Sequence, residues 1–83
     1  MMLGLFASEV RRDFRDMVLS EVEAMYGVDA RADAEEAGSD PARIDVVGVA
    51  LRSGVPLVPS SGNARATAKW WARENGYEPV MRA

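Results

Sequence analysis

The chain has 83 residues and a formal net charge of −3, with 48% hydrophobic and 28% charged residues, a balance typical of a folded globular domain. It contains neither Cys nor His, which excludes disulfides and the two commonest transition-metal ligands. We expect a single small domain over residues 1–83, stabilised by a compact core or completed by a partner such as a second copy of the chain.

The opening residues, MMLGLF, are apolar, but charged residues begin at Glu9 and end the run. A secretory signal needs a basic start and a longer apolar stretch, and a membrane-spanning helix needs about 20 apolar residues. The sequence therefore predicts a cytoplasmic protein that does not associate with a membrane.

The next segment predicts an amphipathic helix from about Ala7 to Tyr26. Its apolar residues recur at spacings of three and four: Phe6, Val10, Phe14, Met17, Val18, Val22 and Met25. Ser8 is suited to cap the start, and Gly27 can end the helix in a left-handed conformation. The apolar stripe must pack against the rest of the chain or against another molecule.

Residues 28–42 are rich in acidic residues and Ala, and we interpret them as an acidic linker with room for a helical turn around 30–37. A calcium-binding loop needs oxygen ligands at alternating positions and a central Gly. Arg31 occupies one ligand position, and no Gly follows Asp33 at the required offset. We therefore expect no metal site and no cofactor.

Residues 44–58 favour a β-hairpin. Ile44, Val46, Val47 and Val49 are β-branched, and Ser53-Gly54 is a turn signal before a short return strand at Val55–Val58. A helix is the alternative, because Ile44, Val47 and Leu51 would share one helical face. ALRSGVP also resembles the helix-to-turn passage of a helix-turn-helix.

The last helix is predicted from about Asn63 to Asn75, with Ser61 or Asn63 as its cap. Asn75-Gly76 is a stop signal, after which Tyr77 should fold back onto the last turn. Residues 78–81 would form an extended tail or a third short strand. The predicted fold class is α+β, with two main helices on a short hairpin or small antiparallel sheet in the order α-β-β-α.

The stretch RATAKWWARENGY, residues 65–77, divides between two faces of this helix. A rotation of about 100° per residue places Arg65, Lys69 and Arg73 in one arc with Trp70 at its edge. Trp71 falls with Ala64, Ala68 and Ala72, and we expect that face to join the core. The basic arc is the candidate partner-binding site: Arg65, Lys69, Trp70 and Arg73.

WARENGY, residues 71–77, resembles the helix end in the DNA-binding domain of a family of actinobacterial nucleoid-associated proteins. In that family an Arg-Gly-Arg segment follows the helix and enters the minor groove. Here Glu78-Pro79-Val80 follows instead. The resemblance therefore covers the end of the helix but not the segment that contacts DNA, and we infer no function from it.

Charge is unevenly distributed along the chain. Residues 1–45 hold eleven acidic and five basic residues, whereas residues 46–83 hold two acidic and five basic residues. The two halves could attract each other within one fold, or either could meet a partner. An acidic surface that mimics nucleic acid is one alternative, formed by Asp13, Asp16, Glu21, Glu23, Asp33, Glu35 and Glu36.

No catalytic arrangement stands out. Without His and Cys, the usual general bases and nucleophiles are missing, and Lys69 is the only lysine. We expect a non-enzymatic regulator that acts by binding a larger protein, such as a phage or bacterial accessory inhibitor. The alternatives are nucleic-acid binding through the basic arc, the acidic mimic, and a structural subunit of an oligomer.

Overall fold

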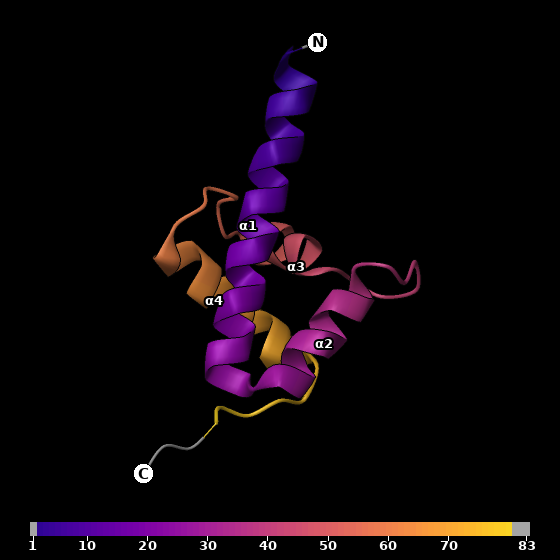
Figure 1. The fold of residues 1–83 in the computed structure, drawn as a ribbon, viewed down its shortest axis with the longest axis vertical. Helices are drawn as coiled ribbons and strands as arrows, with labels where there is room; N and C mark the ends of the chain where they lie inside the picture. Colours follow the sequence, from indigo (N-terminus) through magenta and orange to yellow (C-terminus); the bar gives the residue numbers. More distant parts are fainter. Residues whose placement is uncertain (1, 81–83) are drawn as a thin grey trace.

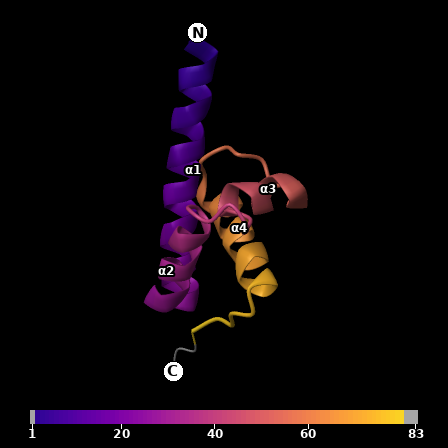
Figure 2. The same ribbon diagram turned by 90° about the vertical axis from the view of Figure 1, so that its right-hand side faces the viewer.

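The computed structural model describes residues 2–80, and for residues 2–8 it describes the backbone only. It contains four helices: α1 (Met2–Tyr26), α2 (Val28–Ala37), α3 (Val46–Ser53) and α4 (Ser61–Glu74). Helix α1 runs the length of the molecule, and its N-terminal turns extend beyond the other helices (Figure 1). Helix α2 returns beside the C-terminal half of α1, while α3 and α4 lie together on another side (Figure 2).

The predicted α+β fold with a hairpin at residues 44–58 is wrong, because the described residues contain helices and no strand. Residues 46–53 form α3, which buries Val46, Val47 and Val49. Three valines in place of Ala weaken a helix by about 2 kcal/mol in total, whereas burying three valines stabilises the fold by about 5–9 kcal/mol. Burial against α1 and α4 therefore outweighs the β-propensity of the valines.

The turn signal in this region ends a helix instead of joining two strands. Gly54 has a left-handed conformation (φ 76°), and the Val55 N–H donates to the Ala50 carbonyl at 2.9 Å. Residues 55–60 continue as a loop without secondary structure. The alternative of a helix was correct, but only Val47 of its proposed face is buried, and Ile44 and Leu51 are exposed.

The segment expected to be an acidic linker is mostly helix α2. Ala30, Ala34 and Ala37 recur along one side of it and are buried. Their small side chains allow α2 to lie close to α1, and Ala is the strongest helix former. Arg31 contacts Glu35 one turn further on, at 3.2 Å between Nε and Oε2. The remaining linker is the loop that precedes α3.

Helix α1 ends at Tyr26, as predicted, but it begins at Met2, so Ser8 lies inside the helix and does not cap it. Gly27 separates α1 from α2 and has φ 100°, a conformation that favours glycine. Its N–H donates to the Glu23 carbonyl (3.0 Å), and its own carbonyl accepts from the Arg31 N–H (3.2 Å). Gly27 thus makes one backbone hydrogen bond to the end of α1 and one to the start of α2.

Helix α4 is capped by Ser60, whose side-chain oxygen accepts from the Asn63 N–H at 3.2 Å. The predicted caps, Ser61 and Asn63, both lie inside the helix. The predicted ending is confirmed: Gly76 has φ 79°, and the Tyr77 N–H folds back to the Ala72 carbonyl at 2.9 Å. The tail then runs extended to Val80, with no strand within residues 77–80.

The core is one cluster to which all four helices contribute. Phe14, Val18 and Val22 of α1 are fully buried together with Trp71 of α4, as the helical periodicity predicted. The inward face of α4 is completed by the predicted alanines Ala64, Ala68 and Ala72. Met17 and Met25 are only partly buried at the edge of the cluster. Phe6 lies among the residues whose side chains are outside the described part.

Polar contacts connect the helices around this core. Arg15 of α1 pairs with Asp45, the residue that precedes α3, through an Nε–Oδ2 hydrogen bond of 3.0 Å. Arg43, in the loop before α3, donates to Asp33 of α2 at 2.7 Å and to the Asn75 side chain at 3.1 Å. These contacts fix α3 and the end of α4 relative to α1 and α2.

Candidate functional site: a cationic and aromatic face of α4

The outward side of α4 carries four residues that line a shallow hollow of about 270 Å³: Ala66, Lys69, Trp70 and Arg73. We call these residues the α4 face. Trp70 is 41% exposed, whereas its neighbour Trp71 is completely buried. The predicted division of the two tryptophans between the core and the basic arc is therefore confirmed.

Arg73 lies over the ring of Trp70, with 5.4 Å between its Cζ atom and the ring centroid. Such a cation–π contact is worth about 0.5–1 kcal/mol at an exposed site. Lys69 is one helical turn from Arg73, and like charges at that spacing destabilise a helix by a few tenths of a kcal/mol. Within the described residues neither cation forms an ion pair. The cation–π contact thus offsets the repulsion between the two cations, and their charges stay available to a partner molecule.

Arg65 differs from the other cations of the predicted arc, because it forms an ion pair within the chain. Its Nε atom lies 3.3 Å from Glu21 Oε1 on α1, so its charge is already partnered. Arg15, Arg31, Arg43 and Arg52 are likewise paired with acidic residues. Among the described cations, only Arg11, Arg12, Lys69 and Arg73 have no such partner, and only the last two stand beside an exposed aromatic ring.

A second hollow, of about 450 Å³, adjoins the first and shares Lys69 and Arg73 with it. Its other lining residues come from the end of α1 and from the tail: Tyr26, Gly76, Tyr77, Glu78 and Pro79. Sequence reasoning did not assign these residues to the site. The one indication in the sequence was the predicted return of Tyr77 onto α4, which implies that the residues next to Tyr77 in the chain lie near the end of that helix.

Tyr77 is held in this position from two sides. Its ring stacks on Trp71, with centroids 5.4 Å apart and planes inclined by 16°. Its hydroxyl donates to Asp33 Oδ2 at 3.0 Å. That hydrogen bond, together with burial and the negative charge of Asp33, raises the pKa of Tyr77 above its usual value. The tail is anchored further along, where the Val80 N–H donates to the Met25 carbonyl at 2.7 Å.

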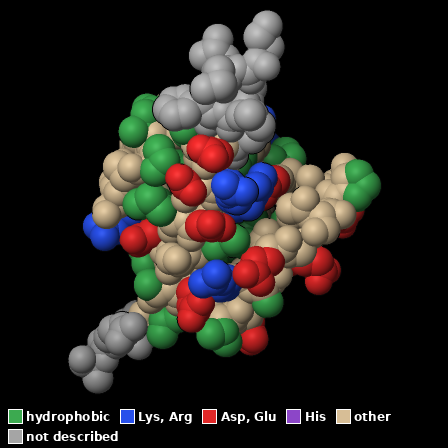
Figure 3. Space-filling view, turned by 45° about the horizontal axis from the view of Figure 1, so that its top comes forward, with side chains coloured by type: hydrophobic (Ala, Val, Ile, Leu, Met, Phe, Trp, Pro, Cys, Tyr) green, Lys and Arg blue, Asp and Glu red, His purple; other side chains and the backbone are tan. Residues whose placement is uncertain are grey.

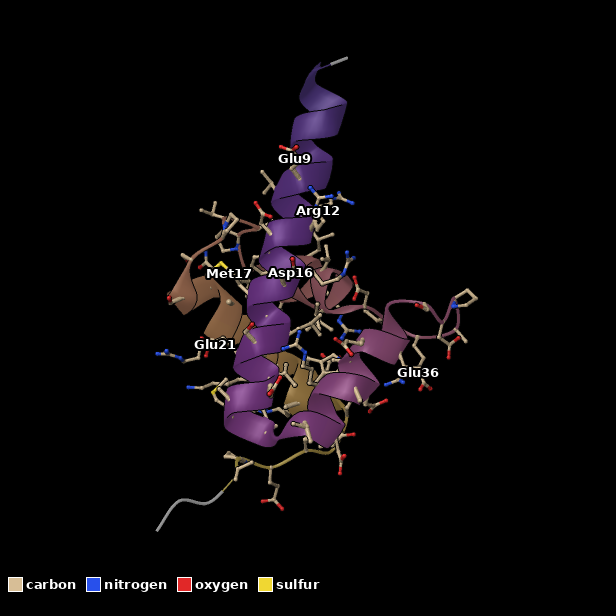
Figure 4. The ribbon with its side chains drawn as sticks, in the orientation of Figure 1. Glu9, Arg12, Asp16, Met17, Glu21 and Glu36 are labelled. Carbon is tan, nitrogen blue, oxygen red and sulfur yellow. The ribbon has the colours of Figure 1, made fainter. Side chains whose placement is uncertain are left out.

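The acidic residues of the alternative surface do not form one continuous patch. Glu21, Glu23, Asp33 and Glu35 are paired with arginines, which leaves Asp13, Asp16 and Glu36 as exposed members without an ion pair in the described part of the chain. Asp16 and Glu21 lie along α1, whereas Glu36 lies on α2 (Figure 4). On the face shown in Figure 3, basic side chains stand between the acidic ones.

Neither a metal-binding group nor a membrane-spanning helix is found in residues 2–80. No cluster of three or more His, Cys, Asp or Glu side chains there is arranged to hold a metal ion. No helix in that range combines the length and the apolar character needed to cross a bilayer.

Comparison with known proteins gives no family assignment. The chain matches no protein-family model, and no curated protein or solved structure shows significant similarity to it.

Proposed function

We propose that this protein is a non-enzymatic binding protein that docks onto a larger protein through Lys69, Trp70 and Arg73 of the α4 face. The supporting observation is that two cations without an acidic partner in the described residues flank an exposed tryptophan, while five arginines elsewhere are paired. Trp and Arg supply much of the binding energy at protein interfaces. By occupying a surface of its partner, such a protein would act as an accessory regulator or inhibitor.

A protein partner suits this face better than nucleic acid does. Proteins that bind duplex DNA tightly often neutralise about 6–10 phosphates, and their affinity falls steeply with salt. Here Glu21 already partners Arg65, which leaves two cations on α4 in a chain of net charge −3. Glu78 also lines the adjoining hollow. Two charges and a tryptophan can anchor a protein contact, whereas they provide little attraction for a polyanion.

The test is an affinity pull-down from a lysate of the organism that encodes the chain, carried out with and without nuclease treatment. The wild type is compared with Lys69→Glu/Arg73→Glu and with a control, Arg11→Glu/Arg12→Glu, which reverses two exposed cations on α1. Each double substitution makes the net charge four units more negative. The two variants therefore match in overall charge and differ only in which surface is altered.

We expect a defined partner protein to be retained by the wild type and by the α1 control, and to be lost with the α4 variant. Far-UV circular dichroism would confirm that all three proteins are folded. Equal retention by the α4 variant would refute the proposed docking face. Retention that disappears on nuclease treatment would identify nucleic acid as the ligand instead.

A further inference from the structure

We infer that the partner segment recognised by the α4 face carries a carboxylate with an apolar side chain on each side of it. The inference rests on the proposed function and specifies its recognition chemistry. It follows from the arrangement of this surface, where Lys69 and Arg73 lie between two hollows that differ in their other lining residues.

The two hollows share Lys69 and Arg73 and have no other lining residue in common. The cations therefore form the boundary between them. A segment that crosses this boundary must present a group that suits both cations, and it can place one side chain in each hollow. A carboxylate is that group, because it accepts charge-assisted hydrogen bonds from Lys and Arg.

The first hollow is apolar apart from the cations at its edge. Ala66 and Trp70 supply its remaining lining, and no acidic side chain takes part. Because Arg73 lies over the Trp70 ring, it is restrained by that contact while its N–H donors at the guanidinium edge stay available to a carboxylate. The partner's first apolar side chain would thus pack on the indole beside an ion pair with Arg73.

The second hollow contains two tyrosines and a proline together with Glu78. Tyr26 and Pro79 offer apolar surface, and Tyr77 is fixed by its contacts with Trp71 and Asp33. Glu78 would repel a second carboxylate placed here. The charge pattern of the surface therefore favours a neutral apolar side chain in this hollow and confines the carboxylate to the neighbourhood of Lys69 and Arg73.

The experiment is a selection of phage-displayed random twelve-residue peptides on the immobilised full chain, with counter-selection on Lys69→Glu/Arg73→Glu. We expect the selected peptides to be enriched in Asp or Glu with apolar residues on both sides. One consensus peptide is then synthesised and titrated against the wild type. Its affinity should fall at least tenfold when its acidic residue is changed to the amide, and likewise with Trp70→Ala or Lys69→Glu/Arg73→Glu.

The control protein Arg11→Glu/Arg12→Glu should bind the consensus peptide as the wild type does. Selected peptides without acidic enrichment, no selection above the counter-selected background, or an unchanged affinity for the amide peptide would each overturn the inference. So would tighter binding of a twelve-residue oligothymidylate than of the peptide.

The peptide selection and the pull-down fail in different ways. If the selection yields no acidic pattern but partner retention still depends on Lys69 and Arg73, the docking face stands and the recognition chemistry is wrong. If partner retention is independent of both cations, the proposed function itself fails.

Discussion

Trp70 and Trp71 are adjacent in the chain, yet the rotation of about 100° per helical residue directs one toward solvent and the other into the core. Trp71 belongs to the same cluster as Phe14, Val18 and Val22 and stacks on Tyr77. Trp70 instead carries Arg73 over its ring. Trp71 therefore belongs to the core, whereas its neighbour Trp70 belongs to the surface.

Replacing each tryptophan by Ala should reveal this difference. Trp71→Ala should lower the free energy of unfolding by about 3–5 kcal/mol, because it removes a buried aromatic side chain and leaves a cavity. Trp70→Ala should change it by no more than about 1 kcal/mol, as is usual for an exposed position. Urea denaturation at pH 7 measures both values, and losses of equal size would contradict the assignment.

Asp33 is expected to make the stability of the fold depend on pH. Its carboxylate accepts from Arg43 at 2.7 Å and from the Tyr77 hydroxyl at 3.0 Å. The hydrogen bond from Arg43 is the main cause of a pKa for Asp33 below the usual 3.8, although partial burial opposes the shift. Since this pKa is lower in the folded chain, the stabilisation is present above the unfolded pKa and is lost as pH falls through the folded pKa.

We expect the free energy of unfolding of the wild type to fall more steeply below pH 4 than that of Asp33→Asn. Denaturation curves measured at intervals from pH 6 to pH 2 would compare the two slopes. Glu36→Gln is the matched control, because it neutralises an exposed acid of the same helix that forms no ion pair in the described chain. If Asp33→Asn kept the wild-type slope, the Asp33 contacts would not be responsible.

At the scale of single elements, α1 and α4 were predictable because their apolar residues follow the helical period over several turns. Helix α3 spans only two turns, and its valines favour a strand when propensity alone is considered. Its helical state depends on burial against α1 and α4, which a local pattern does not contain. In α2 the spacing of Ala30, Ala34 and Ala37 is that of one helical face, but the many acidic residues between them favoured interpretation of the segment as a linker.

The start of α4 provides a test of how local contacts set a helix boundary. Ser60 accepts a hydrogen bond from the Asn63 N–H, whereas its neighbour Ser61 is exposed in the first turn. Ser60→Ala should therefore cost about 0.5–2 kcal/mol of unfolding free energy, and Ser61→Ala should cost less than about 0.5 kcal/mol. Thermal denaturation of the two variants would measure the contrast. The reverse order would show that the cap lies at Ser61, one of the two caps that the sequence had indicated.

For the molecule as a whole, the single core cluster predicts cooperative unfolding. All four helices contribute buried residues to it, although α2 contributes only alanines. Urea curves followed by far-UV circular dichroism and by tryptophan fluorescence should therefore coincide. Trp70→Phe serves for the measurement, because Trp71 is then the sole fluorescent tryptophan. A dichroism transition at a lower urea concentration than the fluorescence transition would mean that part of the helical structure unfolds separately.

The uneven charge along the sequence does not hold the molecule together. Among the described residues, Arg65–Glu21 is the only ion pair that joins the acidic half to the basic half. The other pairs form within one half or the other. Exposed pairs of this kind are each worth about 0–1 kcal/mol. The buried apolar cluster, and not attraction between the halves, therefore accounts for most of the stability.

The sequence by itself determined which face each tryptophan of α4 occupies and that this helix ends before Gly76. It also determined the apolar stripe of α1 and, by lacking Cys and His, excluded disulfides and the chemistry of these side chains. These features depend on residue identity and on the helical period, both of which are local. The tertiary structure decided that residues 46–53 are helical, that Arg65 is partnered by Glu21, and that Tyr26 and Tyr77 adjoin Lys69 and Arg73. Those outcomes depend on which residues meet across helices far apart in the chain, and the burial and pairing that result outweigh local preference.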